Sequence, residues 1–239
     1  MHSPYGMELT GSCETCALRG EGFFCNLSKS CLKAFDAVKF TSGYPASAVL
    51  FVEGEGARGV YMLCKGRVKL TMTSADGKTM ILRIVKAGEV LGLHAVVSGK
   101  AYQATAETLE PCQVNFVRRD DFLRFLSQNP EASIHAAQQL SVDYQTACDQ
   151  IRSLGLTHSA SEKLARFLLE TSAKGQETKQ GIRVRLTMTH EEIGQMIGAS
   201  RETVTRTLGE FRDKHVVVRN GSMLVIQNRE ALESFAGAY

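Results

Sequence analysis

Residues 186–206, which read LTMTHEEIGQMIGASRETVTR, decide the fold of the C-terminal part of the chain. Thr189 and Glu192 have the spacing of a capping box, which predicts a helix that begins there. Gly198 predicts a tight turn, and Ser200 is a favoured N-cap for a second helix. Two short helices joined by a short turn that contains Gly are typical of a helix-turn-helix motif.

Apolar residues recur along both expected helices with the period of an amphipathic helix. The residues expected to face inward are Ile193, Met196 and Ile197 in the first helix, and Val204, Leu208 and Phe211 in the second. Two apolar runs then flank Asn220–Gly221, a dipeptide preferred in two-residue hairpins. A helix-turn-helix followed by a hairpin predicts a winged helix.

The first turns of the second helix carry side chains suited to reading DNA. A recognition helix places its N-terminal residues against base edges in the major groove. Arg can bind guanine O6 and N7 together, and Glu can accept a hydrogen bond from cytosine N4. The expected DNA-binding residues are Thr189, Ser200, Arg201, Glu202, Thr205 and Arg206. His190, Lys214 and Arg219 are candidates for phosphate contacts, with ordinary surface roles as the alternative.

The region from about Phe35 to Phe125 has the pattern of β-structure. Val68, Leu70 and Met72 alternate with polar residues, as in a half-buried strand. Further strands are expected at residues 49–52, 60–63, 80–85, 104–106 and 112–117. Many short strands separated by Gly-rich turns predict a small barrel or roll.

A long helix is expected to begin near Pro130. Its apolar residues follow an alternating spacing of three and four: Ala137, Leu140, Tyr144, Ala147, Ile151 and Leu154. This a/d spacing indicates self-association through the helix, and packing on its own domain is the alternative.

Ser159 and Glu162 have capping-box spacing and predict an amphipathic helix through Thr171, followed by a polar loop at 173–181.

Composition is that of an ordinary globular protein. Hydrophobic residues make up 44% of the 239 residues and charged residues 22%. No apolar run reaches the roughly 18 residues that span a bilayer, and the N-terminus lacks a signal-peptide pattern, so we expect a cytoplasmic protein. A net charge of +3 does not by itself indicate a nucleic-acid partner. No catalytic motif is complete, so we expect no enzymatic activity.

Seven cysteines are many for a chain expected in a reducing compartment, where metal binding or redox chemistry is more usual than disulfides. Four of them lie near the N-terminus, in a stretch expected to be a loop: Cys13, Cys16, Cys25 and Cys31. Thiolates bind iron–sulfur clusters or structural zinc, and a redox-sensitive thiol is a third possibility. Cys64 and Cys148 are interpreted as small core residues.

In residues 186–206 and in the order of roll, long helix and winged helix, the chain resembles the CRP/FNR family of bacterial transcription regulators. The resemblance implies an α+β fold with a β-roll of the cyclic-nucleotide-binding type. The expected parts are a Cys-rich segment (1–34), the roll as sensor domain (35–128), a dimerisation helix (129–156) and a winged helix-turn-helix domain (157–239). The resemblance also implies a homodimer that binds palindromic double-stranded DNA and works with RNA polymerase.

The roll departs from the family branch that binds cyclic AMP. In that branch, a Gly-Glu-Leu motif is followed by an Arg-Ser-Ala motif. The Glu binds the ribose, and the Arg and Ser bind the phosphate. Here Leu93 takes the place of Glu, and Tyr102 and Gln103 take the places of Arg and Ser. A cyclic phosphate would lack its charge partner, so we expect no binding of cyclic AMP. A cyclic-nucleotide-binding module without a DNA-binding function is the least favoured alternative.

The sensor side is more similar to the oxygen-sensing branch, whose members bind a [4Fe–4S] cluster through N-terminal cysteines and one internal cysteine. Cys25 and Cys31 resemble the last N-terminal pair, and residues 106–112 resemble the segment with the internal ligand. The family spacing would also place a cysteine near Gly22, where this chain has none. We therefore expect a redox- or oxygen-responsive cluster bound by four of five residues: Cys13, Cys16, Cys25, Cys31 and Cys112. Zinc, a thiol switch, an unidentified small-molecule effector and haem at His94 are the alternatives.

The recognition helix, in contrast, resembles the cyclic-AMP receptor branch. Arg201, Glu202 and Arg206 correspond to that branch's reading residues. The resemblance implies TGTGA-like half-sites in an inverted repeat. Arg201 and Arg206 would then bind guanines, and Glu202 the cytosine on the opposite strand.

Overall fold

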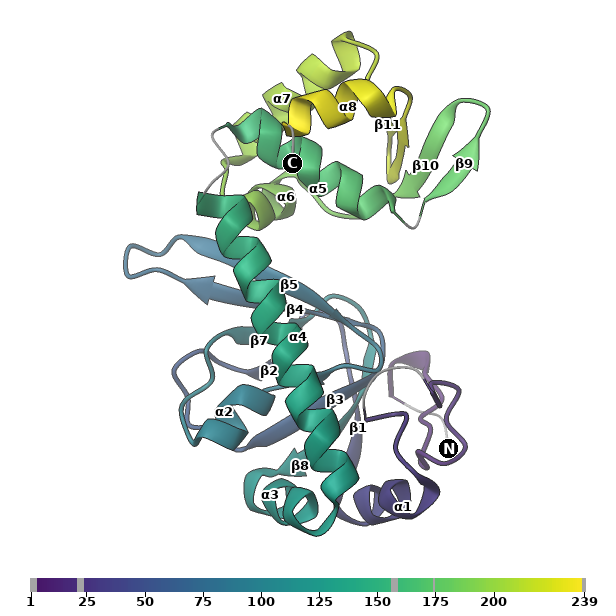
Figure 1. Ribbon diagram of the computed structural model, residues 1–239, viewed down its shortest axis with the longest axis vertical. Coiled ribbons are helices and arrows are strands. Elements are labelled where there is room, and N and C mark those ends of the chain that lie inside the picture. The colour runs from purple at the N-terminus through teal and green to yellow at the C-terminus, as the bar shows by residue number, and fades with distance from the viewer. Residues whose placement is uncertain (1–3, 21–23, 156–158, 174, 238–239) are drawn as a thin grey trace. The chain divides into compact units, whose positions relative to one another are not determined.

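The computed structural model describes residues 4–20, 24–155, 159–173 and 175–237 (Figure 1). The chain packs as two compact units, Met1–Thr146 and Ala147–Tyr239. The long helix α4 (Pro130–Gly155) begins where the sequence predicts and crosses the division between the units. The boundary expected at 156/157 lies outside the described residues. Among the described helices, none is both long and apolar enough to cross a membrane.

Two four-stranded antiparallel sheets form the first unit and confirm the predicted roll. In spatial order, one sheet contains β1 (Phe40–Tyr44), β8 (Cys112–Arg118), β3 (Gly59–Lys65) and β6 (Val90–Leu91). The other contains β2 (Val49–Phe51), β7 (Thr105–Thr108), β4 (Arg67–Thr73) and β5 (Thr79–Lys86). Residues from both sheets enclose an apolar core that includes Leu63, Val68, Val85 and Val114.

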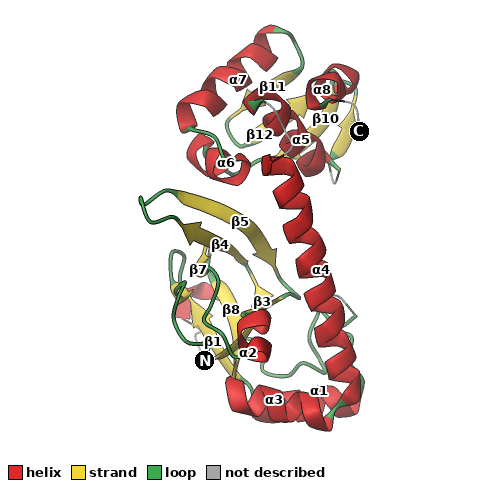
Figure 2. Ribbon diagram, turned by 60° about the vertical axis from the view of Figure 1, so that its left-hand side comes forward, coloured by secondary structure: helices red, strands yellow, loops and turns green. Residues whose placement is uncertain are grey.

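A second core covers the outer face of the sheet that contains β3 and β8. Strand alternation directs Leu63 into the roll and Val60 and Met62 to the opposite face. There they pack with residues of α1 (Lys29–Val38), α3 (Arg119–Gln128) and the first turns of α4. Figure 2 shows α1 and α3 side by side next to the start of α4. Strand β3 is therefore buried on both faces.

The first unit contains three helices that the sequence analysis does not predict: α1, α2 (Leu93–Ser98) and α3. The prediction of a loop through Cys31 is wrong, because α1 buries Cys31, Leu32 and Phe35 on one face and also crosses the expected 34/35 boundary. Ser28 precedes α1 without a side-chain bond to the helix. Instead, its backbone N and its hydroxyl donate to Glu131, so no local capping signal marks this helix in the sequence.

Strand β4 follows the predicted alternation only over its first part. Val68 and Leu70 are buried as expected, but Met72 is 36% exposed. The pairing of β4 with β5 shifts register between Leu70 and Thr71. Residues beyond this bulge no longer follow the alternation that directs the start of the strand into the core.

The second unit has the order expected of a winged helix. Its elements are α5 (Ala160–Ser172), β9 (Gln176–Thr178), β10 (Gly181–Arg185), α6 (His190–Ile197), α7 (Arg201–Asp213), β11 (Val217–Asn220), β12 (Met223–Ile226) and α8 (Arg229–Ala236). The sheet order is β11–β12–β10–β9. One apolar core includes Leu164, Ile193, Val204, Phe211 and Leu224. The segment expected as a polar loop at 173–181 contains β9, and α8 has no counterpart among the predicted elements.

The predicted helix starts are confirmed at atomic detail. Thr189 Oγ1 accepts from Glu192 N at 3.2 Å, and Glu192 Oε2 accepts from Thr189 N at 2.7 Å, which completes the capping box. Ser200 Oγ accepts from Thr203 N at 3.2 Å at the start of α7. Ser159 caps α5 through Glu162 N at 3.1 Å.

Candidate functional site

The turn between α6 and α7 sets the geometry of the helix pair. Gly198 adopts a left-handed conformation with φ of 66°, which favours glycine. A Cβ on Gly194 would lie only 2.6 Å from Ala199 O, so the close approach of α6 to the turn requires glycine at this position too. Ala199 N donates to Gly194 O at 2.9 Å across the turn.

The outer face of α7 carries the expected reading residues. Arg201, Glu202, Thr205 and Arg206 are exposed, while the opposite face of α7 is buried in the unit's core. Arg206 is nearly free of local pairing, since the ion pair between its Nε and Glu210 Oε1 spans 4.0 Å. Hydrogen bonding, first to its own backbone N–H, lowers the pKa of Glu202, which therefore stays ionised. The face thus presents two cations and one carboxylate to a ligand.

Two of the expected DNA-binding hydroxyls act within the fold. Thr189 and Ser200 are the N-caps of α6 and α7, where their oxygens satisfy backbone N–H groups. Both residues are exposed at the helix N-termini. The structure therefore gives them a structural role whether or not they also contact DNA.

The candidate phosphate contacts differ in their surroundings. His190 Nδ1 lies 2.8 Å from Thr205 Oγ1, and burial together with the charges of Arg219 and Arg201 lowers the pKa of His190. Arg219 Nη2 donates to Met188 O at 2.8 Å, and its buried Nη1 has no partner among the described residues. His190, Arg201 and Arg219 therefore form one electropositive group.

Lys214 lies apart from this group, at the C-terminal end of α7. Its Nζ lies 4.9 Å from the centre of the Phe235 ring, as in a cation–π contact.

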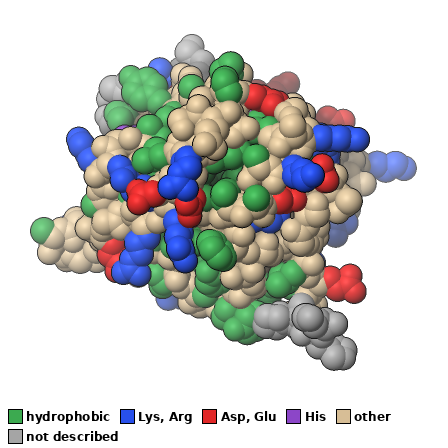
Figure 3. Space-filling model, turned by 90° about the horizontal axis from the view of Figure 1, so that it is seen from below, with side chains coloured by type: hydrophobic (Ala, Val, Ile, Leu, Met, Phe, Trp, Pro, Cys, Tyr) green, Lys and Arg blue, Asp and Glu red, His purple; other side chains and the backbone are tan. Residues whose placement is uncertain are grey.

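Figure 3, seen from the end of the first unit that carries α1 and α3, shows Lys and Arg side chains interspersed with Asp and Glu. The face drawn there lacks the uniformly basic character of a nucleic-acid surface.

The long helix α4 exposes an apolar stripe along its length. Ile134, Tyr144 and Ile151 are exposed by 59%, 72% and 71%, and Ala137 is exposed on the same side of the helix. Leu140, expected in the same seam, packs instead against the core of the first unit. Ala147 is half-buried, and the side chain of Leu154 lies outside the described residues. The exposed stripe therefore contains Ala137, Tyr144 and Ile151 of the predicted seam, but not Leu140.

Tyr102, at the position of the phosphate-binding arginine in the cyclic-AMP branch, is buried in the roll. Its hydroxyl donates to Gly59 O at 2.7 Å and accepts from Arg58 N and Gly59 N, each at 3.1 Å. Its ring stacks on Phe51 with centroids 4.1 Å apart. A Cβ on Gly92 would lie 2.8 Å from the same ring. The tyrosine is therefore packed tightly and fully hydrogen-bonded to the backbone.

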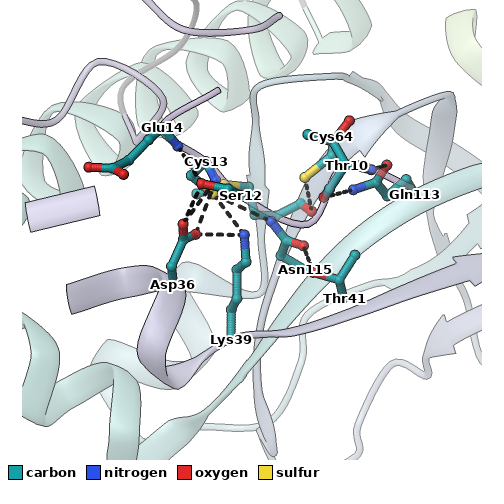
Figure 4. Close-up of polar contacts among 11 residues, drawn as sticks. Thr10, Ser12, Cys13, Glu14, Asp36, Lys39, Thr41, Cys64, Gln113 and Asn115 are labelled. Atoms are coloured by element: carbon teal, nitrogen blue, oxygen red, sulfur yellow. Dashed lines mark hydrogen bonds and ion pairs between the residues drawn. The ribbon is translucent and has the colours of Figure 1, made fainter. Parts of the chain in front are cut away.

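The N-terminal segment lies against the outer face of the β8–β3 sheet (Figure 4). Gln113 holds Thr10 through two hydrogen bonds of 2.9 and 2.8 Å to its backbone. Cys13 N donates to the Asp36 carboxylate at 3.0 Å. Lys39 Nζ lies 3.1 Å from Cys13 Sγ and 2.6 Å from Asp36 Oδ1.

Cys64, interpreted from the sequence as a small core residue, lies on this same face. Cys13, Cys25 and Cys64 all pack against the core shared by α1, α3 and β3. Burial raises the pKa of the Cys64 thiol to about 12, and the negative charges that Cys13, Cys25 and Cys16 carry as thiolates add to the effect. Burial likewise raises the pKa of Cys13 to about 11. Cys13, Cys16 and Cys25 therefore lie within electrostatic reach of Cys64.

The other two expected ligands differ in position. Cys112 faces the inside of the roll, where its thiol donates to Glu110 O at 3.1 Å and to Arg67 O at 3.4 Å. Cys31 is buried on α1 within the same core that Cys13 and Cys25 contact, and burial, followed by the charge of Glu131, raises the pKa of its thiol. The structure thus separates Cys112, but not Cys31, from the other expected ligands.

These cysteines are not arranged to bind a single metal ion. Within the described part of the chain, no three His, Cys, Asp or Glu side chains are grouped closely enough to hold a metal ion. The position near Gly22, where the family spacing would place a cysteine, lies outside the described residues. His94, the alternative haem ligand, is exposed on α2.

Comparison with known families finds a match to a family model in each of the two units. Residues 42–129 match the family model of the cyclic nucleotide-binding domain, and residues 162–235 match that of the Crp-like helix-turn-helix domain. The cAMP-activated global transcriptional regulator CRP of Pasteurella multocida is 29% identical over 184 residues, which cover 77% of this chain and 88% of that protein.

Solved structures give the same result. FixK2 from Bradyrhizobium japonicum aligns with a TM-score of 0.71 and 25% identity, covering 84% of this chain and 99% of that one. TTHB099, a CRP-family transcriptional regulator from Thermus thermophilus, aligns with a TM-score of 0.67 and 26% identity, covering 82% and 97%. With its β-roll, long helix and winged helix-turn-helix, the chain belongs to the CRP/FNR family of DNA-binding transcription regulators.

Proposed function

We propose that this regulator is a homodimer that reads an inverted repeat of TGTGA-like half-sites and responds to redox state or oxygen through an iron–sulfur cluster on its N-terminal thiols. The observation that carries the DNA-binding part is the exposed face of α7, with Arg201, Glu202 and Arg206 near the helix N-terminus. Two copies of this helix would enter successive major grooves, and RNA polymerase is the expected partner at promoters.

The chemistry of base reading follows from the side chains on α7. The guanidinium groups of Arg201 and Arg206 can each donate two hydrogen bonds to a guanine, and the ionised Glu202 can accept from a cytosine. His190 and Arg219 lie beside this face, where positive charge attracts the DNA backbone. Arg219 contributes its positive charge there, while its Nη1 is buried and has no partner among the described residues.

Tyr102 supports a signal other than cyclic AMP. A cyclic nucleotide bound as in the cyclic-AMP branch needs a cation at its phosphate, and here that position holds a buried, neutral side chain. The tyrosine hydroxyl is already bonded to three backbone groups of Arg58 and Gly59, and the side chain carries no charge to balance a phosphate. We expect added cyclic AMP to leave operator affinity unchanged.

Thiol chemistry supports redox sensing instead. Cys13, Cys16 and Cys25 lie on a segment attached to the roll by a few hydrogen bonds, so a change at these thiols can release or fix that segment. An iron–sulfur cluster would supply a centre that oxygen or oxidation can alter. Such a change acts on DNA affinity by shifting the populations of two conformations of the dimer. Zinc, a thiol switch without metal and a small-molecule effector are the competing possibilities.

Operator binding tests the DNA-reading part directly. Fluorescence anisotropy with a duplex that contains inverted TGTGA half-sites should show tighter binding than a scrambled duplex. Arg206→Ala should cost about 1–3 kcal/mol of binding free energy and relax preference at one base position. Arg212→Ala is the matched control, since Arg212 is exposed in the last turn of the same helix and is paired with Asp213. Equal loss on both duplexes with Arg206→Ala would make Arg206 a phosphate contact instead.

The sensing part has its own test. Anaerobically prepared protein with bound cluster and the same protein after cluster removal should differ in operator affinity. Identical affinities in the two states would contradict cluster-based sensing without affecting the assignment of DNA binding.

A further inference from the structure

We propose that Cys64, and not Cys112, is the internal ligand of the iron–sulfur site, together with thiols of the N-terminal group Cys13, Cys16, Cys25 and Cys31. This inference rests on the proposed function for the presence of a cluster, and it changes the set of residues that would bind it. The resemblance to the oxygen-sensing branch implies Cys112 as the internal ligand. The structure places Cys112 and Cys64 on opposite faces of one sheet.

The alternation of strands β3 and β8 separates the two cysteines. Cys64 packs with Val60 and Met62 on the outer face of β3. Cys112 packs with Val114 on the inner face of β8, which pairs directly with β3. Because successive side chains of a strand point to opposite faces, a thiol on the inner face cannot reach a ligand held on the outer face.

The N-terminal segment is fixed to the outer face, where Cys64 lies. Its anchors on the sheet are the side chain of Gln113 and that of Asn115, whose Nδ2 lies 3.8 Å from Cys13 Sγ. Figure 4 shows Thr10, Cys13 and Cys64 on the same side of the β8–β3 strands. Within the segment, Gly20 N donates to Cys25 O at 3.3 Å, which folds the chain back on itself. Cys25 thereby reaches the same core as Cys13 and Cys64.

Cys112 has no room for a cluster beside it. A single Cβ on Gly66 would lie 2.5 Å from Cys112 Sγ, so the thiol is packed directly against the backbone of the β3–β4 turn. The thiol already donates to two nearby carbonyls, those of Glu110 and Arg67. A cluster of several iron and sulfide atoms would have to displace the roll's own core there.

One positive charge lies beside the thiols on the outer face. The ammonium of Lys39, whose side chain is 4% exposed, lies against Cys13 Sγ and offsets negative charge that would otherwise be buried. Cys13, Cys16 and Cys25 lie within electrostatic reach of Cys64. Among the described residues, no three His, Cys, Asp or Glu side chains are grouped closely enough to hold a single metal ion. Thiols are the usual ligands of iron–sulfur clusters, so the donor set suits such a cluster.

Anaerobic cluster reconstitution tests the ligand set. Wild type, Cys64→Ser and Cys112→Ser would be compared by iron and acid-labile sulfide per chain and by visible absorption. Changes to outer-shell partners cost metal sites about 10–100-fold in affinity, and loss of a ligating thiolate should lower cluster retention by more than that. We expect this loss for Cys64→Ser and near wild-type loading for Cys112→Ser. Cys112→Ser is a conservative control, since a serine hydroxyl can donate to the same two carbonyls.

A second readout keeps the test independent of folding defects. Mass spectrometry after alkylation of wild type should show Cys64 and the ligating N-terminal cysteines protected with the cluster and labelled after its removal, with Cys112 unchanged. All variants should retain wild-type unfolding midpoints. Loss of the cluster in Cys112→Ser with retention in Cys64→Ser would overturn the inference and leave the proposed function intact. Wild type that never binds iron would instead overturn the proposed sensing itself, and this ligand set with it.

Discussion

Tyr102 is held inside the roll by hydrogen bonds between its hydroxyl and the backbone. Its hydroxyl satisfies one carbonyl and two N–H groups of residues 58 and 59. Tyr102→Phe removes these partners inside a packed core, so we expect a loss of about 1–3 kcal/mol in unfolding free energy. Urea denaturation measures this loss. Tyr5→Phe is the control, because Tyr5 is exposed, and it should change stability by less than about 0.5 kcal/mol.

His190 should make DNA affinity depend on pH. Burial and then the charges of Arg219 and Arg201 lower its pKa in the free protein below the ordinary 6.5. DNA phosphates favour the imidazolium and raise that pKa, so binding takes up a proton. Affinity should therefore rise as pH falls below about 6.5, by about tenfold for each pKa unit between the two states.

The matched variant for this prediction is His190→Gln. Glutamine can keep a hydrogen bond to Thr205 but does not titrate. Anisotropy titrations between pH 5.5 and 7.5 (roughly the histidine range) should show a flatter profile for the variant. The same slope in both proteins would exclude His190 as the source.

At the level of elements, the helix pair α6–α7 depends on its caps. Ser200→Ala leaves Thr203 N without its partner and should cost about 0.5–2 kcal/mol in unfolding free energy. Ser200→Gly should cost only a few tenths, because glycine leaves the N-terminus open to water. Thermal or urea unfolding of both variants makes the comparison. A large loss with glycine would indicate a role for the hydroxyl beyond capping.

Elements also differ in how far the sequence reveals them. The capping signals of α6 and α7 lie within a few residues of each helix start, so they can be read locally. Helix α1 lacks such a signal, since Ser28 bonds to Glu131 across 103 positions. Strand β3 is covered on both faces, so its run from Val60 to Cys64 shows no polar alternation to reveal which side Cys64 faces.

At the level of the whole molecule, the apolar stripe of α4 should hold the dimer together. Tyr144→Glu with Ile151→Glu would place charges in that interface, and we expect the dimer dissociation constant to rise at least about tenfold, or 1.4 kcal/mol. Sedimentation velocity measures the change. Val142→Glu is the control, because Val142 is exposed on a different side of α4. A dimer equally weakened by the control would place the interface elsewhere.

The winged helix, the roll, the long helix and the exposed face of α7 could all be predicted from the amino-acid sequence. These features depend on caps, turns and periodic burial, which act between residues close in the chain. The folded arrangement was needed to show which cysteines share a face, that Leu140 turns inward, and that the Tyr102 hydroxyl bonds to the backbone of residues 58 and 59. Those outcomes depend on strand pairing and on packing between segments that are distant in sequence. Neither the spacing of residues nor the composition shows which of these segments come into contact.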